Sequence, residues 1–153
     1  MDTGGGIIKA RWFLDTDAPF LVHNIDIYSD IDLDKLYRAH LASNSLATLA
    51  VSDRKTSRNL LLDQDGFLSG WKNNATGETI IVREEKNLRP VAFSGIHIIE
   101  PEIFNLIDST DPFSMTTAYL ELARDHQINT YDHTGDTWID MAHRDNFPGV
   151  SWL

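Results

Sequence analysis

Hydrophobic and polar stretches alternate in the first third of the chain in the order strand, helix, strand. Residues 20–26 are a near-continuous apolar run that turns polar only at its end, which is typical of a buried strand. Asp32 is placed to cap a helix over 33–41, where apolar residues recur at helical spacing, and residues 46–51 are again continuously apolar. This order predicts a βαβ unit, with parallel strands and a covering helix.

The middle of the chain has a different pattern. Residues 59–62 and 67–71 flank an Asp65-Gly66 pair, which is a strong hairpin signal, so we expect an antiparallel insert here. A polar turn over 73–78 and a strand over 79–82 follow, and the charged stretch 83–90 is expected to be a loop.

The remaining elements complete a mixed α/β fold. A short helix is expected over 7–14 and a buried strand over 91–99. Further helices are expected over 102–107, opened by Pro101, and over 115–123, capped by Ser114. Residues 128–132 and 137–142 are expected to form a final pair of strands around Gly135-Asp136. The prediction is one domain over 1–153, with a mainly parallel sheet, helical cover and an antiparallel hairpin insert.

Charge and composition narrow the classes of partner. The chain carries 13 Lys and Arg against 23 Asp and Glu, a formal charge of −10, so we expect neither nucleic acid nor an anionic membrane as partner. A phosphorylated small molecule or a metal remains compatible. With no cysteine, disulfides, thiolate zinc sites and cysteine nucleophiles are excluded. No targeting segment is visible and no apolar run approaches the ~20 residues of a membrane span, so we expect a cytoplasmic protein.

Two carboxylates are the strongest candidates for chemistry. Asp26 ends a buried strand, at the sheet edge where α/β proteins bind ligands, although a strand-end Asp also commonly bonds the next turn. Asp140 lies inside the apolar segment 138–142, where a charge requires a cation, a metal or a hydrogen-bond donor. Two carboxylates from separate strands, completed by substrate phosphates, are a common way to hold Mg²⁺.

The cations and glycines leave alternatives open. Lys72 at the end of the hairpin strand is either a phosphate ligand or an exposed lysine lying over Trp71. The cluster of Arg54, Lys55 and Arg58 is either a local anion site or a solvated loop. The glycines at 4–6 have neither dinucleotide-motif nor P-loop spacing and are either a flexible turn or a close approach to a ligand. His23, His97 and His143 show no metal-ligand spacing and are expected to be packing residues.

Four segments, in order, resemble the sugar-1-phosphate nucleotidyltransferases, especially the N-acetylmuramate-1-phosphate uridylyltransferase and mannose-1-phosphate guanylyltransferase group. Residues 2–7 resemble the family's Glu-Thr-Gly-Gly-Gly-Ile, and residues 19–26 resemble a strand ending in Asn-Gly-Asp. Residues 93–96 resemble the strand beside the sugar pocket, and residues 138–142 resemble Trp-x-Asp-Val-Gly. Residues 70–73 fall where relatives often carry Glu-Glu-Lys-Pro.

The resemblance implies a GT-A-like nucleotide-diphospho-sugar transferase fold and a Mg²⁺-dependent reaction. A nucleoside triphosphate and a sugar 1-phosphate would give NDP-sugar and pyrophosphate. It implies that Asp26 and Asp140 hold the metal. It also implies that Thr3, Gly4 and Gly5 contact the nucleotide, and that the sugar-phosphate ligands are Asn24, Lys72, Ser94 and Gly95.

The chain also departs from the family pattern. The family's first strand and Gly-rich triphosphate loop have no counterpart, Ile25 replaces the Gly of Asn-Gly-Asp, and Ala142 replaces the Gly after the second Asp. We therefore expect a C-terminal part of the enzyme domain, inactive alone, with the glycines after Met1 marking the cut. The alternative is a non-catalytic sugar-phosphate-binding or interaction remnant, and a glycosyltransferase is a weaker third option. An exposed sheet edge left by the missing strand predicts a homodimer.

Overall fold

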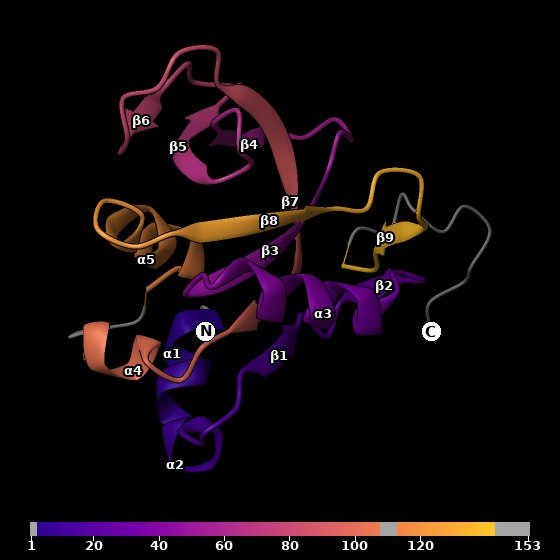
Figure 1. Cartoon of the computed structure of the whole chain (residues 1–153). Coiled ribbons are helices and arrows are strands. Elements are labelled where there is room, and N and C mark those ends of the chain that lie inside the picture. Colours follow the sequence, from indigo (N-terminus) through magenta and orange to yellow (C-terminus); the bar gives the residue numbers. More distant parts are fainter. Residues whose placement is uncertain (1–2, 108–112, 143–153) are drawn as a thin grey trace.

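The computed structural model describes residues 3–107 and 113–142, which form five helices and nine strands (Figure 1). Their bounds, in chain order, are α1 Thr3–Lys9, α2 Arg11–Leu14, β1 Phe20–His23, β2 Ile27–Ser29, α3 Leu33–Ser43, β3 Ala47–Ser52, β4 Arg58–Leu62, β5 Leu68–Asn73, β6 Thr79–Ile81, β7 Arg89–Ile99, α4 Ile103–Leu106, α5 Met115–Leu122, β8 Ile128–Asp132 and β9 Trp138–Asp140.

The long strand β7 organises the main sheet. Its first half pairs with β4, its second half pairs with β1, and β3 runs beside it over most of its length, all antiparallel. The strand order is β6-β5-β4-β7-β3-β8 with β1 also on β7, and the small strands β2 and β9 form a separate antiparallel pair. Between strands β3 and β8 the pairing is parallel.

The mixed α/β fold and the hairpin insert are confirmed, but the expectation of a mainly parallel sheet is wrong. Strands β1 and β3 do run in the same direction on either side of α3, as the βαβ pattern predicted. However, β7 lies between them and is antiparallel to both. The hydrophobic pattern of a fully buried strand is the same for either direction of its neighbours, so the sequence could not reveal the insertion of β7.

Helices cover both faces of the sheet. On one face α3 packs Leu36 against Ala50, Ile96 and Ile98. On the other face the larger core joins residues of α1, α4 and α5 to β3, β4 and β7. The predicted caps are present: Asp32 accepts a hydrogen bond from the Lys35 N–H at 3.0 Å, and Ser114 accepts one from the Thr116 N–H at 3.2 Å.

Two local expectations are wrong. The glycine segment is not a flexible turn, one of the two alternatives for it, because α1 begins at Thr3 and includes all three glycines. The strands after α5 do not pair with each other: β8 pairs with β3, and β9 pairs with β2, a strand that the sequence pattern did not predict. Among the described residues, no helix is long and apolar enough to cross a membrane.

Candidate active site

The β2–β9 pair brings Asp26 and Asp140 to neighbouring backbone positions. Asp26 directly precedes β2, Ile27 is registered opposite Asp140, and the N–H of Met141 donates to the carbonyl of Asp26 at 2.7 Å. Asp26 is exposed, whereas Asp140 is half-buried and accepts a hydrogen bond from the N–H of Ala142 at 2.9 Å. Two aspartates far apart in the sequence therefore lie at neighbouring backbone positions.

Asn24 and Gly95 are in direct contact beside these carboxylates. The N–H of Asn24 donates to the carbonyl of Gly95 at 2.9 Å. Gly95 has a φ of +72°, and a Cβ added there would lie 2.8 Å from Asn24 Nδ2. The β3–β7 register also shifts between Leu49 and Val51, opposite this part of β7. A glycine is required here because the backbone is left-handed and the Asn24 side chain occupies the space of a Cβ.

Arg54 places a cation between the strands that carry the candidate residues. Its guanidinium lies over the ring of Trp138 at 3.6 Å from the centroid and donates to the carbonyl of Phe93. Its Nε atom is buried and has no hydrogen-bond partner in the described part of the chain. Burial lowers the pKa of Arg54, and the nearby carboxylate of Asp140 opposes this shift. The guanidinium of Arg54 therefore lies near Asp140, a candidate metal ligand.

Ser94 and His133 form a buried hydrogen-bonded pair behind Trp138. Ser94 Oγ and His133 Nε2 are 2.7 Å apart, and the indole N–H of Trp138 donates to the carbonyl of Ser94 at 2.8 Å. Burial lowers the pKa of His133, so its imidazole is neutral at pH 7. The Ser94 hydroxyl is buried and hydrogen-bonded to His133, so Ser94 could contact a ligand only through its backbone atoms.

The structure does not bring Lys72 to this group. Lys72 is exposed on β5, where it is registered opposite Asn59 of β4 and Thr79 of β6. Its neighbour Trp71 lines a pocket between β5 and α5, and successive strand residues point to opposite faces, so Lys72 faces away from that pocket.

The glycine segment has a packing explanation. Gly4 is buried, and a Cβ there would lie 2.6 Å from both the ring and the carbonyl of Phe113. Gly5 is half-buried in the same helix, and the Thr3 side chain lies outside the described residues. His143, which was expected to pack, also lies outside the described part.

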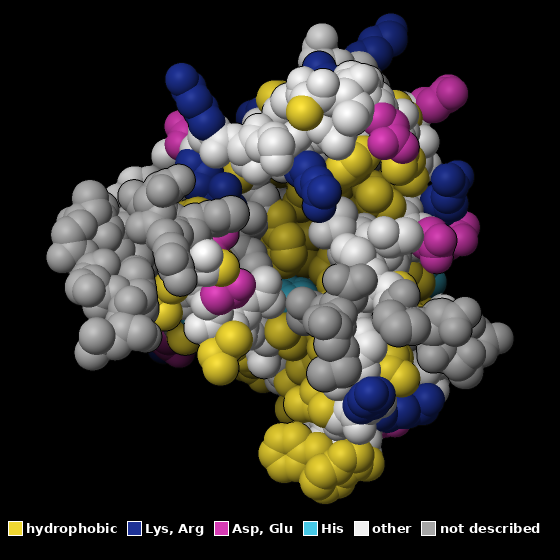
Figure 2. Space-filling view, turned by 180° about the vertical axis from the view of Figure 1, so that it is seen from behind, with side chains coloured by type: hydrophobic (Ala, Val, Ile, Leu, Met, Phe, Trp, Pro, Cys, Tyr) yellow, Lys and Arg dark blue, Asp and Glu magenta, His cyan; other side chains and the backbone are white. Residues whose placement is uncertain are grey.

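A groove connects α1 with Asp26. It has a volume of about 560 Å³ and is lined by Gly6, Ile7, Ala10 and Leu14 and by residues 21–26. Ile25, which lines the groove, is 96% exposed, and outside the groove Trp12 and Phe13 of α2 are also exposed. Figure 2 shows hydrophobic side chains gathered at the lower end of the molecule, where α2 lies in Figure 1. A surface of this kind is typical of a contact with further polypeptide.

Two residues of this site, Arg54 and His133, were not predicted from the sequence, and each comes shortly after one of the two parallel strands, β3 and β8. In the sequence Arg54 is one member of a basic cluster with Lys55 and Arg58, and no motif marks His133. Arg54 follows β3 and His133 follows β8, so both lie at the carboxyl ends of a parallel pair. Because the carboxyl ends of parallel strands commonly form ligand sites, their position at strand ends was the signal that could have found them.

The donor set fits a hard divalent cation. Carboxylate oxygens are preferred by Mg²⁺, which commonly takes one or two of them and completes its shell with water and substrate phosphate. No group of three or more His, Asp or Glu side chains that could enclose a metal occurs within residues 3–107 and 113–142. Asp26 and Asp140 therefore fit a site that is completed by substrate, not a closed protein cage.

No protein-family model and no curated protein sequence matches the chain. Solved structures do match its fold. HddC from Yersinia pseudotuberculosis is 18% identical with a TM-score of 0.63, over 95% of this chain and 59% of that protein. The inositol-1-phosphate CTP transferase from T. maritima is 10% identical with a TM-score of 0.72, over 97% of this chain and 58% of that protein. The UDP-glucose pyrophosphorylase from Acinetobacter baumannii is 12% identical with a TM-score of 0.69, over 92% of this chain and 51% of that protein.

The chain therefore spans between half and three fifths of these proteins. At this level of identity the likeness establishes the fold and no more. The resemblance seen in the sequence is confirmed at that level: this chain has the GT-A-like fold of the sugar-1-phosphate nucleotidyltransferases.

Proposed function

We propose that the chain is the sugar-phosphate and metal-binding part of a sugar-1-phosphate nucleotidyltransferase domain. The observation that carries the proposal is the adjacency of Asp26 and Asp140 across the β2–β9 pair. The fold shared with known nucleotidyltransferases supports it. The reaction would join a nucleoside triphosphate to a sugar 1-phosphate, giving NDP-sugar and pyrophosphate.

Asp26 and Asp140 would hold Mg²⁺. When bound, this ion would neutralise negative charge on the phosphates, which is its usual contribution to phosphoryl chemistry. The chain's own residues would position the substrate. Asn24 is hydrogen-bonded to the backbone of Gly95, close in sequence to Asp26, and would present a fixed surface to the substrate. Arg54 contacts the backbone at Phe93 and the ring of Trp138 and so fixes the segment that leads to Asp140. Lys72 would reach the sugar phosphate only if its side chain turned toward this edge.

The nucleotide side of the site would need more polypeptide than the described chain provides. The groove between α1 and Asp26 is the candidate surface; Thr3, Gly4 and Gly5 belong to the same helix, whose contribution to the groove wall begins at Gly6. HddC has been solved with GMP-PN and the A. baumannii enzyme with UTP, and both proteins are longer than this chain. We expect binding of sugar phosphate and metal by the chain alone, without turnover.

The alternative is a sugar-phosphate-binding module without catalysis. It is favoured by Ile25, which is 96% exposed and stands where the family pattern has Gly. A side chain there would obstruct close approach of a substrate to the backbone. If Ile25 obstructs the substrate in this way, Ile25→Gly should increase affinity for a nucleotide sugar, and unchanged affinity would count against this alternative.

Calorimetric titration of the 153-residue chain with glucose 1-phosphate and mannose 1-phosphate, each with and without Mg²⁺, tests the main proposal. Binding should require Mg²⁺ and should be lost in Asp26→Asn and in Asp140→Asn. A matched control is Asp34→Asn, because Asp34 is an exposed carboxylate on α3 that pairs with Arg38. Unchanged metal-dependent binding in both test variants would rule out the assigned ligands.

A further inference from the structure

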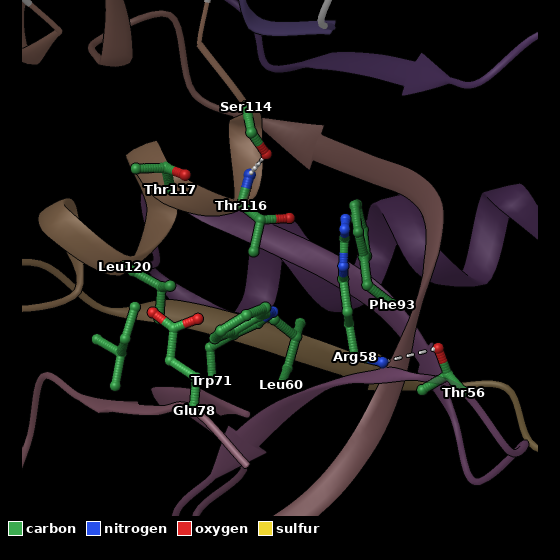
Figure 3. A pocket seen from close by; sticks show the side chains of 11 residues that line it. Thr56, Arg58, Leu60, Trp71, Glu78, Phe93, Ser114, Thr116, Thr117 and Leu120 are labelled. Atoms are coloured by element: carbon green, nitrogen blue, oxygen red, sulfur yellow. Dashed lines mark hydrogen bonds between the residues drawn. The ribbon is translucent and has the colours of Figure 1, made fainter. Parts of the chain in front are cut away.

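A second cavity, of about 430 Å³, lies between the hairpin strands and α5 (Figure 3). We call it the hairpin pocket and define it by Arg58, Leu60, Trp71, Glu78, Phe93 and Thr116. It shares no lining residue with the groove at Asp26. It nevertheless lies close to the candidate active site, because Phe93 contributes its ring to the pocket and its carbonyl to Arg54. Its volume is within the range of small-molecule sites.

The apolar wall of the pocket is fixed by the core. Leu60 is 3% exposed, and Trp71 and Phe93 are half-buried and packed against the main hydrophobic cluster. The Trp71 ring borders the cavity in Figure 3. The face of an aromatic ring is electron-rich, so it attracts the polarised C–H bonds on one face of a sugar ring. This wall is therefore a preformed platform for such a ring.

Arg58 supplies an unpaired cation to the same pocket. Its side chain extends beside the Phe93 ring in Figure 3, while its backbone N–H donates to Thr56 Oγ at 3.3 Å. Other arginines form ion pairs, such as Arg38 with Asp34 and Arg89 with Asp132, but no carboxylate among the described residues pairs with Arg58. Its guanidinium donors are therefore available to a ligand.

Glu78 places a carboxylate on another part of the pocket wall. It forms no ion pair with Arg58. In Figure 3 the two side chains stand on different sides of the Trp71 ring. A ligand lying against Trp71 would therefore meet a cation at one end and a hydrogen-bond acceptor at the other. The hydroxyl of Thr116, which also lines the cavity, adds a neutral polar group.

We infer that the hairpin pocket binds the ring of an acidic sugar 1-phosphate. The ring would lie against Trp71, its carboxylate would bind Arg58, and a ring hydroxyl would donate to Glu78. A carboxylate fits better than a second phosphate. One planar guanidinium matches one planar, singly charged carboxylate, and Glu78 in the pocket wall disfavours a dianionic group inside the pocket. This inference rests on the proposed function and names its substrate class.

The test compares glucuronic acid 1-phosphate with glucose 1-phosphate in calorimetric titrations of the 153-residue chain with Mg²⁺. Glucuronic acid 1-phosphate should bind more tightly. Arg58→Gln should weaken it about tenfold to a hundredfold, which corresponds to one hydrogen-bonded charge pair, and should change glucose 1-phosphate binding little. Arg58→Lys should recover only part of the loss, because an ammonium does not bind a carboxylate in a bidentate way. Arg38→Gln, which removes an arginine from α3, is the charge-matched control.

The position of the ligand is checked by ¹⁵N NMR of the indole N–H groups, assigned with Trp71→Phe. The Trp71 signal should shift on addition of glucuronic acid 1-phosphate, and the signal of exposed Trp12 should not. Equal binding of both sugars with no effect of Arg58→Gln would overturn the acidic-sugar inference while leaving the nucleotidyltransferase proposal intact. Binding that depends on Arg58 but is unchanged without Mg²⁺ and in Asp26→Asn would support the hairpin pocket as the sugar site and overturn the proposed metal site. Absence of binding by either sugar would overturn the inference.

Discussion

The buried histidine His97 makes stability depend on pH in a calculable way. His97 lies on β7, is fully enclosed, and hydrogen-bonds through Nδ1 to the phenol of Tyr119. Burial lowers the pKa of His97 to about 3, from an ordinary value of 6.5, because the charged imidazolium would lose its hydration inside the core. The folded protein therefore keeps this ring neutral over the whole range in which the unfolded chain protonates it.

The magnitude follows from this difference in pKa. Between pH 7 and pH 5 the unfolded chain takes up a proton at His97 and the folded chain does not, so lowering the pH favours unfolding. With pKa values of 6.5 and about 3, the free energy of unfolding falls by about 2 kcal/mol over this interval. The loss begins as pH drops below 6.5 and continues toward pH 3. His40 and His133, whose pKa values are also lowered by burial, act in the same direction.

The assay is urea denaturation followed by circular dichroism at pH 7 and at pH 5. His97→Gln removes the titrating group and keeps a polar partner for Tyr119, so its pH-dependent loss should be about 2 kcal/mol smaller than that of the unaltered chain. His23→Gln, at an exposed position on β1, should keep the full loss. If His97→Gln and the unaltered chain lose the same free energy between the two pH values, His97 is not held neutral and the reasoning is refuted.

Three further substitutions test other parts of the structure. Gly95→Ala should lower the free energy of unfolding by about 1–3 kcal/mol, because its φ of +72° strains any side chain; an unchanged urea midpoint would contradict this. Arg54→Lys should lower it by about 1–2 kcal/mol, since an ammonium does not reproduce the planar stack on Trp138, and full stability in this variant would count against the contact. The edge strand β1 pairs only with β7 among the described residues, so we expect a dimer in light scattering that Leu21→Lys converts to monomer. A monomeric unaltered chain at high concentration would exclude that interface.

Local features of the fold were predictable from the sequence because their causes are local. The Asp65-Gly66 turn has Gly66 at a φ of +87°, a conformation that the dipeptide favours. Asp32 and Ser114 cap their helices through side-chain geometry that depends on the next few residues alone. The hairpin and both helix starts were therefore correctly located.

The pairing of strands that are far apart in the sequence was harder to predict. The position of β7 between β1 and β3 is decided by tertiary packing, and a fully apolar strand has no pattern that reveals the direction of its neighbour. The helical conformation of the glycine segment is similarly explained by the fit of Gly4 against Phe113, which is remote in sequence.

The candidate site was predictable only in part. Asp26 and Asp140 stand out in the sequence as strand-end and strand-interior carboxylates, and the structure brings their backbones to neighbouring positions through β2, a strand that the sequence pattern did not predict. Arg54 could not be separated from Lys55 and Arg58 by composition. Its distinctive property is a contact with Trp138, which exists only once β9 folds back onto the sheet.

The central claim is that Asp26 and Asp140 together hold a divalent metal. Mn²⁺, which replaces Mg²⁺ at oxygen sites and broadens nearby NMR signals, tests it directly. Added Mn²⁺ should broaden the backbone amide signals of Ile27 and Met141 in the unaltered chain and should leave them sharp when both aspartates are changed to asparagine. Broadening that persists in the double variant, or that is confined to the acidic start of α3 at Asp32 and Asp34, would contradict the claim.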